Sequence, residues 1–521
     1  MLDKYISYIG TIIQPKSNKY FSFMLNNESN IQIDSIVAIE IDQIKGKSNV
    51  LLSKVSKIET NYYIKNPELY FLNKAANNQL HNIDQSNTQY GIIATCDIIG
   101  FFEFKENYGF TSSKEKYSLY TPLPLQKVYL IPEKYLSSIY GISPNTKDSI
   151  YLGDVVHPFL SKAFIQKNIF SIHTLISGIS GAGKTRLASL IIRNLAQNGA
   201  HVVIIDPHFE YLDLVMDKND NSTAINVYSR NKKSYKNDNL RKQFDILENI
   251  ENIKSKNLEF SSQLVTSSTL CKILPNLSSQ QQEIIHAEFE FAYTQYKETN
   301  SKENLLVYFF NHLNQQLVYS EEDLNQMIFE EHGKQMIPSF KINKYLESKR
   351  SKGRYLVIES IAKRINDLIQ ENIFVDELPS WLDKGNATID IINDDFSDDE
   401  VGKRMVNTIM SHFLEIKSND KQRILVIDEA HKLLNIEDNQ TRKLIFQLLR
   451  ESRKFNTSLL LLTQNYNDLP PEILALFHNV FRFKEVNNED FRNLPSKMCH
   501  VNIVNSMCNF IMKVDNVKSY F

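Results

Sequence analysis

The sequence is poor in cysteine and has no long apolar segment. Its four cysteines, Cys96, Cys271, Cys499 and Cys508, include no Cys-x-x-Cys pair. We therefore expect buried or inert thiols in a reducing compartment. No apolar run approaches the ~18 residues that a membrane-spanning helix needs. The first ten residues also lack the basic segment followed by an apolar run that is typical of a signal peptide. These absences predict a cytoplasmic protein that has no membrane partner.

The chain also lacks an excess of charge of either sign, with 59 Lys and Arg against 61 Asp and Glu. Because the global field is then weak, any DNA binding must come from local basic patches. The 42 % of hydrophobic and 23 % of charged residues are typical of a globular protein. A length of 521 residues exceeds one ordinary core and predicts two or three domains.

The first 145 residues are rich in short β-type segments separated by turn-forming residues. The predicted strands are Tyr5–Ile13, Tyr20–Leu25, Ser35–Ile41, Val50–Ile58 and Tyr90–Ile99. Short strands at such spacing are typical of a small barrel or sandwich. We predict an N-terminal β-barrel over residues 1–145.

After residue 145 the pattern changes to alternating strands and helices. The predicted strands are Phe170–Ser177, Ala200–Ile205, Ala387–Ile392, Ile424–Ile427 and Ser458–Leu462, and the predicted helices are Lys184–Asn198, about Asp398–Ile416 and Gln440–Phe455. This alternation predicts an α/β core with a mostly parallel, doubly wound sheet over residues 146–230 and 385–521. Residues 231–384 interrupt it, and the apolar spacing in Ser279–Glu298 and Leu356–Glu371 predicts a helical insertion.

Residues 178–185 carry the most specific motif. They read Gly-Ile-Ser-Gly-Ala-Gly-Lys-Thr and fit the pattern G-x-x-x-x-G-K-[ST] between an apolar strand and a helix. Backbone N–H groups of such a loop and the positive end of the following helix bind phosphates. Lys184 is expected at the β- and γ-phosphates of ATP, and the Thr185 hydroxyl is expected to ligate Mg²⁺. The nucleotide-binding residues predicted here are Gly178, Ser180, Gly181, Ala182, Gly183, Lys184, Thr185 and Arg186. The alternative is a Gly-rich turn that binds no nucleotide.

Two later strands end in residues suited to ATP hydrolysis. Asp428 and Glu429 follow the apolar strand Ile424–Ile427. Asp428 is expected to hold magnesium, and Glu429 is expected to orient and polarise the attacking water. Gln464 follows the apolar run Leu459–Leu462 and Thr463, so it is expected beside the γ-phosphate at the carboxyl end of a central strand. An ordinary strand-end turn is the alternative for Gln464.

Arg450 and Arg453 are three residues apart and share a predicted helix face. One interpretation is an arginine that acts on the phosphates of a neighbouring subunit, as phosphoryl transfer often requires. The other is a solvated basic helix end, which the helix dipole favours. Composition alone favours the second interpretation.

Several segments together resemble the HerA branch of the HerA–FtsK superfamily of ring ATPases. Val202–Tyr211 is similar to the strand of that family that ends in D-P-H-G-E-Y, with Phe209 in place of Gly. Ile427–His431 resembles its Walker B strand. Arg450–Phe455 and Leu461–Gln464 resemble its R-E-G-R-K-[YF] and [AS]-T-Q segments.

The resemblance implies a RecA-like core, an N-terminal barrel similar to the HAS barrel, and a homo-hexameric ring. It implies ATP hydrolysis at subunit interfaces and movement along double-stranded DNA, with Arg453 as the trans arginine finger and Arg450 as its neighbour or alternative. It also implies a partner effector, either a nuclease or, in bacterial anti-phage systems, a protein such as a sirtuin-like NADase.

The sequence leaves three hypotheses open. The first is an ATP-driven DNA translocase, and the second is a ring that holds and regulates an effector without being a DNA motor. The third is a type IV secretion or conjugation ATPase with a similar core. Residues 230–236 and 349–354 are local basic clusters that are predicted either to contact DNA phosphates or to be solvated loops.

Overall fold

The computed structural model describes residues 6–15, 19–26, 31–44, 47–64, 88–105, 109–112, 121–208, 210–211, 224–229, 254–317, 339–371, 373–375, 388–392, 400–415, 421–434, 439–486 and 489–515. They fall into two compact units. Unit 1 contains the described residues up to 169 together with 498–515, and unit 2 contains the described residues from 170 to 497. The domain boundaries after residues 145, 230 and 384 remain predictions.

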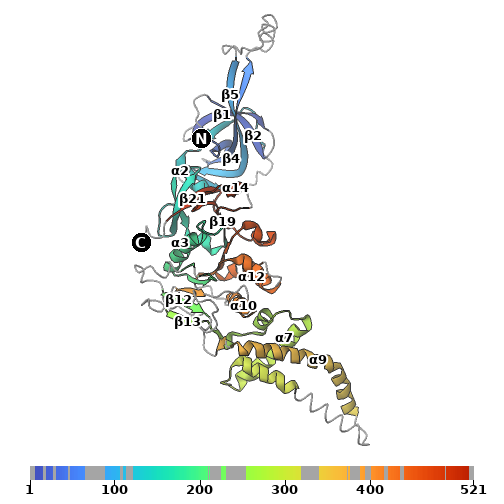
Figure 1. The fold of residues 1–521 in the computed structure, drawn as a ribbon. Helices are drawn as coiled ribbons and strands as arrows, with labels where there is room; N and C mark the ends of the chain where they lie inside the picture. Colours follow the sequence, from blue (N-terminus) through green and yellow to red (C-terminus); the bar gives the residue numbers. More distant parts are fainter. Residues whose placement is uncertain are drawn as a thin grey trace. The chain divides into compact units, whose positions relative to one another are not determined.

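Unit 1 begins with a closed antiparallel barrel, as predicted (Figure 1). Its strands are β1 (Ser7–Pro15), β2 (Tyr20–Leu25), β3 (Ile36–Ile44), β4 (Lys47–Ile64), β5 (Thr88–Lys105) and β7 (Lys127–Leu130), and β6 (Gly109–Ser112) pairs with the end of β5. The strand order is β2-β1-β7-β3-β4-β5, and the pairing of β5 with β2 closes the barrel. Alternate residues of these strands, among them Phe21, Phe23, Val37, Leu51 and Val128, fill the interior.

The rest of unit 1 is a short helix and a second antiparallel sheet. The helix is α2 (Glu133–Ile139), and the strands are β8 (Ser149–His157), β9 (Ser161–Gln166), β20 (Met498–Asn502) and β21 (Phe510–Val514), in the order β20-β21-β8-β9. All four cysteines of the chain are free thiols; Cys96, Cys499 and Cys508 are buried and Cys271 is half-buried. Burial raises the pKa of the Cys271 and Cys508 thiols to about 11, so both stay protonated and unreactive at neutral pH.

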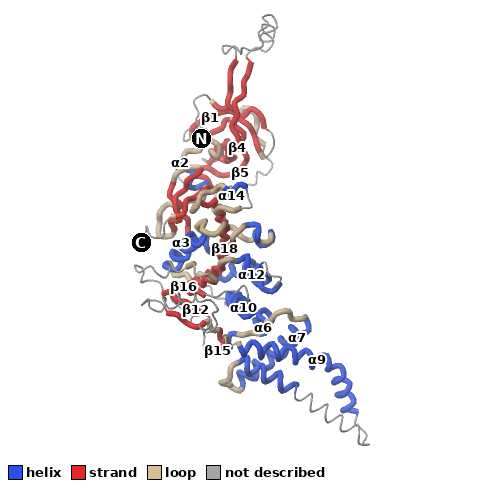
Figure 2. Tube along the Cα trace, in the orientation of Figure 1, coloured by secondary structure: helices blue, strands red, loops and turns tan. Residues whose placement is uncertain are grey.

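Unit 2 is built on a parallel sheet in the order β13-β12-β16-β11-β17-β18-β10-β19. Its strands are β10 (Thr174–Ser177), β11 (His201–Ile205), β12 (Ala224–Ser229), β13 (Lys254–Asn257), β16 (Thr388–Ile392), β17 (Arg423–Ile427), β18 (Thr457–Thr463) and β19 (Asn479–Arg482). Every residue of β10, β11, β16 and β18 is buried, as expected for a parallel sheet covered on both faces. The helices of this part of the chain are α3 (Lys184–Gln197), α10 (Glu400–Glu415), α11 (Ala430–Leu434), α12 (Asn439–Glu451), α13 (Pro471–Leu474) and α14 (Glu489–Arg492), and Figure 2 shows α3, α10 and α12 beside the strands. The predicted P-loop α/β core is confirmed.

Two predicted boundaries in this core were wrong. The strand predicted over Phe170–Ser177 begins only at Thr174, because Lys167–Ser171 is a 3₁₀ turn whose Phe170 carbonyl accepts a hydrogen bond from the Ser458 hydroxyl at 2.8 Å. The helix predicted over Gln440–Phe455 is α-helical only to Glu451. Its last turn, Ser452–Phe455, is 3₁₀, and the Ser452 hydroxyl donates to the carbonyls of Leu448 and Thr457.

The region predicted as a helical insertion is mainly helical where it is described. It contains α6 (Ser267–Ile273), α7 (Ser279–Glu298), a helix over residues 305–317 and α9 (Ser339–Gln370), together with strands β13, β14 (Phe260–Ser261) and β15 (Phe374–Val375), which the prediction missed. Phe289, Phe309, Ile361 and Ile365 are buried among these helices. Within the described ranges, no helix is long and apolar enough to cross a membrane.

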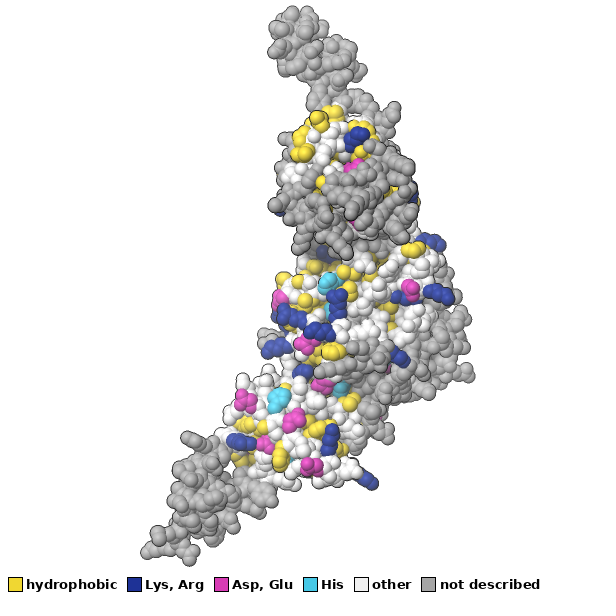
Figure 3. Space-filling view, turned by 180° about the vertical axis from the view of Figure 1, so that it is seen from behind, with side chains coloured by type: hydrophobic (Ala, Val, Ile, Leu, Met, Phe, Trp, Pro, Cys, Tyr) yellow, Lys and Arg dark blue, Asp and Glu magenta, His cyan; other side chains and the backbone are white. Residues whose placement is uncertain are grey.

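Charge is mixed on the surface. On the face shown in Figure 3, Lys and Arg side chains lie among Asp and Glu side chains in the described parts. The basic cluster at residues 230–236 lies outside the described residues. In the cluster at 349–354, Arg354 forms an ion pair with Glu288 at 2.7 Å. The structure does not test whether either cluster contacts DNA, so both contacts stay predictions.

Candidate functional site

The phosphate loop joins β10 to α3 and rests on the residues that follow β19. The Ile179 N–H donates to the Lys484 carbonyl at 2.9 Å. A Cβ atom at Gly178, where φ is +146°, would lie 2.6 Å from Cβ of Phe483. Gly183 precedes α3 with φ +115°, and an added Cβ would approach the Phe483 ring to 3.1 Å. Only glycine fits these two positions, so the loop backbone curls tightly as the motif predicts.

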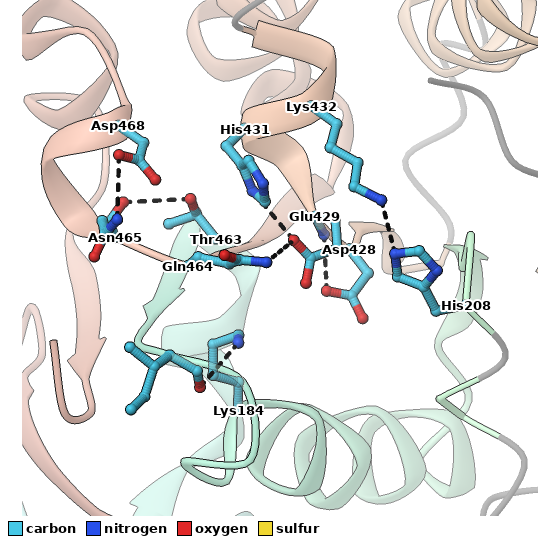
Figure 4. A network of polar contacts seen from close by, with 11 residues as sticks. Lys184, His208, Asp428, Glu429, His431, Lys432, Thr463, Gln464, Asn465 and Asp468 are labelled. Atoms are coloured by element: carbon cyan, nitrogen blue, oxygen red, sulfur yellow. Dashed lines mark hydrogen bonds and ion pairs between the residues drawn. The ribbon is translucent and has the colours of Figure 1, made fainter. Parts of the chain in front are cut away.

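The loop offers donors for an anion. Lys184 is only 7 % exposed, and its Nζ donates to the Ile179 carbonyl of the loop at 3.3 Å (Figure 4). The start of α3 has no capping side chain, so its first backbone N–H groups lack the usual acceptor. A buried ammonium and a helix N-terminus together fit a phosphate group. Ser180 and Gly181 are exposed, Arg186 is half-buried and Ala182 is buried.

The two carboxylates after β17 lie where this strand ends. Asp428 accepts a hydrogen bond from the Glu429 N–H at 2.8 Å. Glu429 has φ +50°, a left-handed conformation that a side chain other than glycine rarely adopts. Such backbone strain is common at functional sites.

Glu429 has polar neighbours from two other places in the site, which Figure 4 shows close together. Gln464, just after β18, donates from Nε2 to Glu429 Oε2 at 3.1 Å. His431 Nδ1 lies 3.2 Å from the same oxygen, without the geometry of a hydrogen bond. The structure therefore brings both Gln464 and His431 to Glu429, while the predicted place of Gln464 beside a γ-phosphate stays a prediction.

The buried carboxylates of this site lie close enough together to disfavour one another's charged form. Burial, together with the neighbouring carboxylates of Asp206 and Glu210, raises the pKa of Asp428 to about 7. Burial likewise raises the pKa of Asp206 to about 6, although three backbone N–H groups oppose the shift. A divalent cation would reverse this effect, and carboxylate and hydroxyl oxygens are the ligands that Mg²⁺ prefers. The residues present therefore fit magnesium together with a nucleotide.

The loop after β11 had no predicted role, although Val202–Tyr211 is one of the segments that carry the family resemblance. The Asp206 carboxylate accepts hydrogen bonds from the N–H groups of His208, Glu210 and Tyr211, each at 3.2 Å. Glu210 accepts a hydrogen bond from the Thr185 hydroxyl. A signal for this role was present in the sequence: one carboxylate, Asp206, directly follows the strand, and a second, Glu210, comes four residues later. Phe209 lies outside the described residues.

Arg450 and Arg453 are not brought to this site within one chain. Arg450 is exposed, with its guanidinium 4.1 Å from the centre of the Phe446 ring. Arg453 is exposed in the 3₁₀ turn after α12. Among the described residues, neither arginine forms a hydrogen bond or ion pair with Lys184 or Glu429. Their role as trans fingers remains a prediction.

The chain is similar to several known proteins. A probable helicase of Methanocaldococcus jannaschii is 22 % identical over 484 residues, which cover 90 % of this chain and 84 % of the relative. A probable DNA double-strand break repair helicase HerA of the same organism is 22 % identical over 402 residues, covering 71 % and 72 %. Among solved structures, VirB4 of Thermoanaerobacter pseudethanolicus aligns with 73 % of this chain and 98 % of its own, at 14 % identity and a TM-score of 0.45.

Two family models match the chain. The model for an AAA-like domain matches residues 388–497. The model described as the central domain of helicase HerA matches residues 150–414, which is just over half of the 521 residues. The chain belongs to the HerA helicase family, and it is a P-loop ATPase of the helicase and translocase type.

Proposed function

We propose that this chain hydrolyses ATP to move double-stranded DNA, as one subunit of a homo-hexameric ring that works with a partner nuclease or another effector in DNA end processing or anti-phage defence. The observation that carries the proposal is the meeting of Lys184, Asp428, Glu429 and Gln464 at one edge of a parallel sheet. The names of the relatives, a helicase and a DNA double-strand break repair helicase, support DNA as the substrate.

Phosphate binding falls to the loop at residues 178–185. The Lys184 ammonium and the first N–H groups of α3 offset the negative charge that develops on the phosphate oxygens. Thr185 and Asp428 would hold Mg²⁺, which neutralises charge on the phosphates when it is bound. Lys184 now donates to the Ile179 carbonyl, a weak acceptor that a phosphate oxygen replaces at little cost.

Glu429 is the proposed general base. Its strained backbone and the amide of Gln464 hold the carboxylate in one orientation, from which it accepts a proton of the attacking water. Within the described part of the chain, both Gln464 and His431 contact Oε2 of Glu429, so Oε1 is the oxygen proposed to accept the proton of the water. Gln464 is thus a sensor that acts through Glu429.

The exposed arginines serve a neighbouring subunit in this proposal. An arginine supplied in trans stabilises the charge of the transition state and contributes roughly 10³–10⁵-fold to the rate. Two variants that are inactive alone test the idea. When Lys184→Ala and Arg453→Ala chains are mixed, ATPase activity is expected to return in part, because some interfaces pair an intact loop with an intact finger. Arg450→Ala, mixed in the same way, distinguishes the two arginines, and no recovery with either one argues against a trans finger.

The test of the motor is steady-state ATP hydrolysis with and without linear double-stranded DNA. We expect DNA to stimulate hydrolysis several-fold, and Glu429→Gln to lower the rate by about 10²–10⁴-fold, the usual contribution of a general base. The matched control is Glu283→Gln, the same change at an exposed position of α7. Hydrolysis that persists in Glu429→Gln refutes the assignment of the base.

A second candidate is an ATP-binding platform that holds and regulates an effector. The balanced charge of the chain and the pairing of Arg354 with Glu288 favour it, because both weaken the case for DNA contacts. On this hypothesis, ATP tightens the assembly and DNA leaves the rate of hydrolysis unchanged. The same assay therefore separates the two candidates.

A further inference from the structure

The loop after β11 has an internal scaffold that fixes its conformation. Asp206 is 1 % exposed, and its own N–H donates to the Ile392 carbonyl of the neighbouring strand at 2.9 Å. Its two carboxylate oxygens accept three backbone N–H groups of the loop, from His208, Glu210 and Tyr211. A carboxylate that receives three such bonds holds a turn in one shape.

Two further contacts tie this loop to its surroundings. His208 Nε2 lies 2.7 Å from Nζ of Lys432 on α11 (Figure 4). Tyr211, at the end of the described loop, is completely buried. The loop is thus anchored on both sides of Glu210, whose own side chain is exposed and, among the described residues, accepts one hydrogen bond. That interaction is the hydrogen bond that Glu210 accepts from the Thr185 hydroxyl.

The chemistry of a hydroxyl ligand explains why this contact matters. A threonine hydroxyl has two lone pairs and one proton, and it ligates a cation through a lone pair. The proton then needs an acceptor, since otherwise the hydroxyl rotates freely and the lone pair faces the cation only part of the time. Groups that accept hydrogen bonds from metal ligands orient those ligands, and their loss typically costs 10–100-fold in metal affinity.

We propose that Glu210 is a positioning residue for magnesium: its carboxylate accepts the proton of the Thr185 hydroxyl and so turns a lone pair of that oxygen toward the cation. Asp206 supports this role by shaping the loop from which Glu210 projects. The inference rests on the proposed ATP and Mg²⁺ site, and it adds a residue of the loop after β11 to a magnesium site otherwise assigned to Thr185 and Asp428.

Equilibrium binding of a fluorescent ATP analogue tests the proposal without depending on hydrolysis. Binding to the full chain is measured first in chelator and then during a titration with Mg²⁺. Glu210→Ala is expected to raise the Mg²⁺ concentration for half-maximal binding by about 10-fold or more, and to leave the affinity in chelator unchanged. A merely structural defect would lower the affinity in chelator as well. Glu283→Ala, at an exposed position of α7, is the matched control.

Two more variants test whether Glu210 acts through Thr185. Glu210→Gln keeps an oxygen that accepts the hydroxyl proton, so it is expected to stay within about threefold of the wild type. In a Thr185→Ala chain, the additional Glu210→Ala change is expected to have less than about a twofold effect, because the interaction is already lost.

Three outcomes overturn the inference and leave the ATP site intact. They are a Mg²⁺ requirement unchanged in Glu210→Ala, a Glu210→Gln defect as large as that of Glu210→Ala, and an equal effect of Glu210→Ala with and without Thr185. The second and third outcomes would mean that the charge of Glu210 acts on the cation directly. If the wild-type chain binds no ATP analogue, or binds it without regard to Mg²⁺, the proposed nucleotide site fails and this inference fails with it.

Discussion

Two glycines of the phosphate loop allow backbone strain and steric exclusion to be measured separately. Gly178 has φ +146°, and a Cβ atom there would lie 2.6 Å from Cβ of Phe483 and 3.2 Å from the Lys484 carbonyl oxygen. Gly181 has φ +75°, and a Cβ atom there would meet nothing within 4 Å. Alanine is disfavoured by the backbone at both positions, but only at Gly178 does it also collide with a packed neighbour.

The expected magnitudes follow from these contacts. A left-handed backbone costs an alanine roughly 1–2 kcal/mol relative to glycine. The collision with Phe483 adds about 1–3 kcal/mol, the usual cost of overpacking. Alanine also reduces the entropy of the unfolded chain, which offsets about 0.4–1 kcal/mol at both positions equally. The backbone cost and the entropy effect apply to both variants and cancel when the two are compared. The difference in free energy of unfolding between Gly178→Ala and Gly181→Ala is therefore the cost of the collision, about 1–3 kcal/mol.

Thermal unfolding of the two variants beside the wild type, in nucleotide-free buffer, measures this difference. For a domain of this size, 1 kcal/mol corresponds to about 2 °C in the melting temperature. Gly178→Ala is thus expected to melt about 2–6 °C below Gly181→Ala. Equal melting temperatures, or a lower one for Gly181→Ala, would refute the reasoning that Phe483 packs too closely against Gly178 to admit a side chain there.

The remaining predictions concern the catalytic carboxylate and the helical region. Gln464→Ala is expected to lower kcat by about 10-fold while the ATP affinity changes little, because the amide contacts Glu429 rather than the phosphate loop; an equal loss of affinity in a binding assay would contradict this. In the helical region, hydrogen bonds from His312 and Arg354 lower the pKa of Glu288 from 4.5 to about 2. Because the folded pKa is the lower one, this network stabilises the fold above about pH 4.5 and loses its contribution as the pH falls toward 2. Glu288→Gln is expected to cost about 1–2 kcal/mol at neutral pH and less at about pH 4, as melting curves at both pH values would show.

Local signals explain which elements the sequence predicted well. Strand β2 and helix α7 have the predicted boundaries at both ends. Helix α7 follows Ser278, whose side chain accepts the Gln281 N–H while the Gln281 side chain accepts the Ser278 N–H, a reciprocal cap that four residues specify. Phe170 was misassigned because its conformation depends on Ser458, which is 288 residues away in the sequence. A boundary set by such a distant contact has no local signature.

The same distinction applies to the candidate site. Asp428 and Gln464 follow apolar strands directly, and Lys184 is fixed by the phosphate-loop motif that joins a third strand to its helix. Because the carboxyl ends of parallel strands meet at one edge, the meeting of these three residues was predictable. Glu210 is five residues beyond the end of β11, and its direction is set by the bonds that Asp206 makes to the loop. Sequence spacing contains no information about that direction.

Strand β18 connects the two halves of the proposed chemistry. Its last residue, Thr463, accepts the Gly178 N–H of the phosphate loop at 3.2 Å, and the next residue, Gln464, donates to Glu429. The turn that follows is itself fixed, because the Thr463 hydroxyl donates to the Asn465 carbonyl at 3.3 Å. The phosphate loop and the Gln464 amide are therefore connected through a single residue of backbone, Thr463. In the proposed mechanism, in which Glu429 is the base, this connection links the phosphate-binding loop to the residue that orients the base.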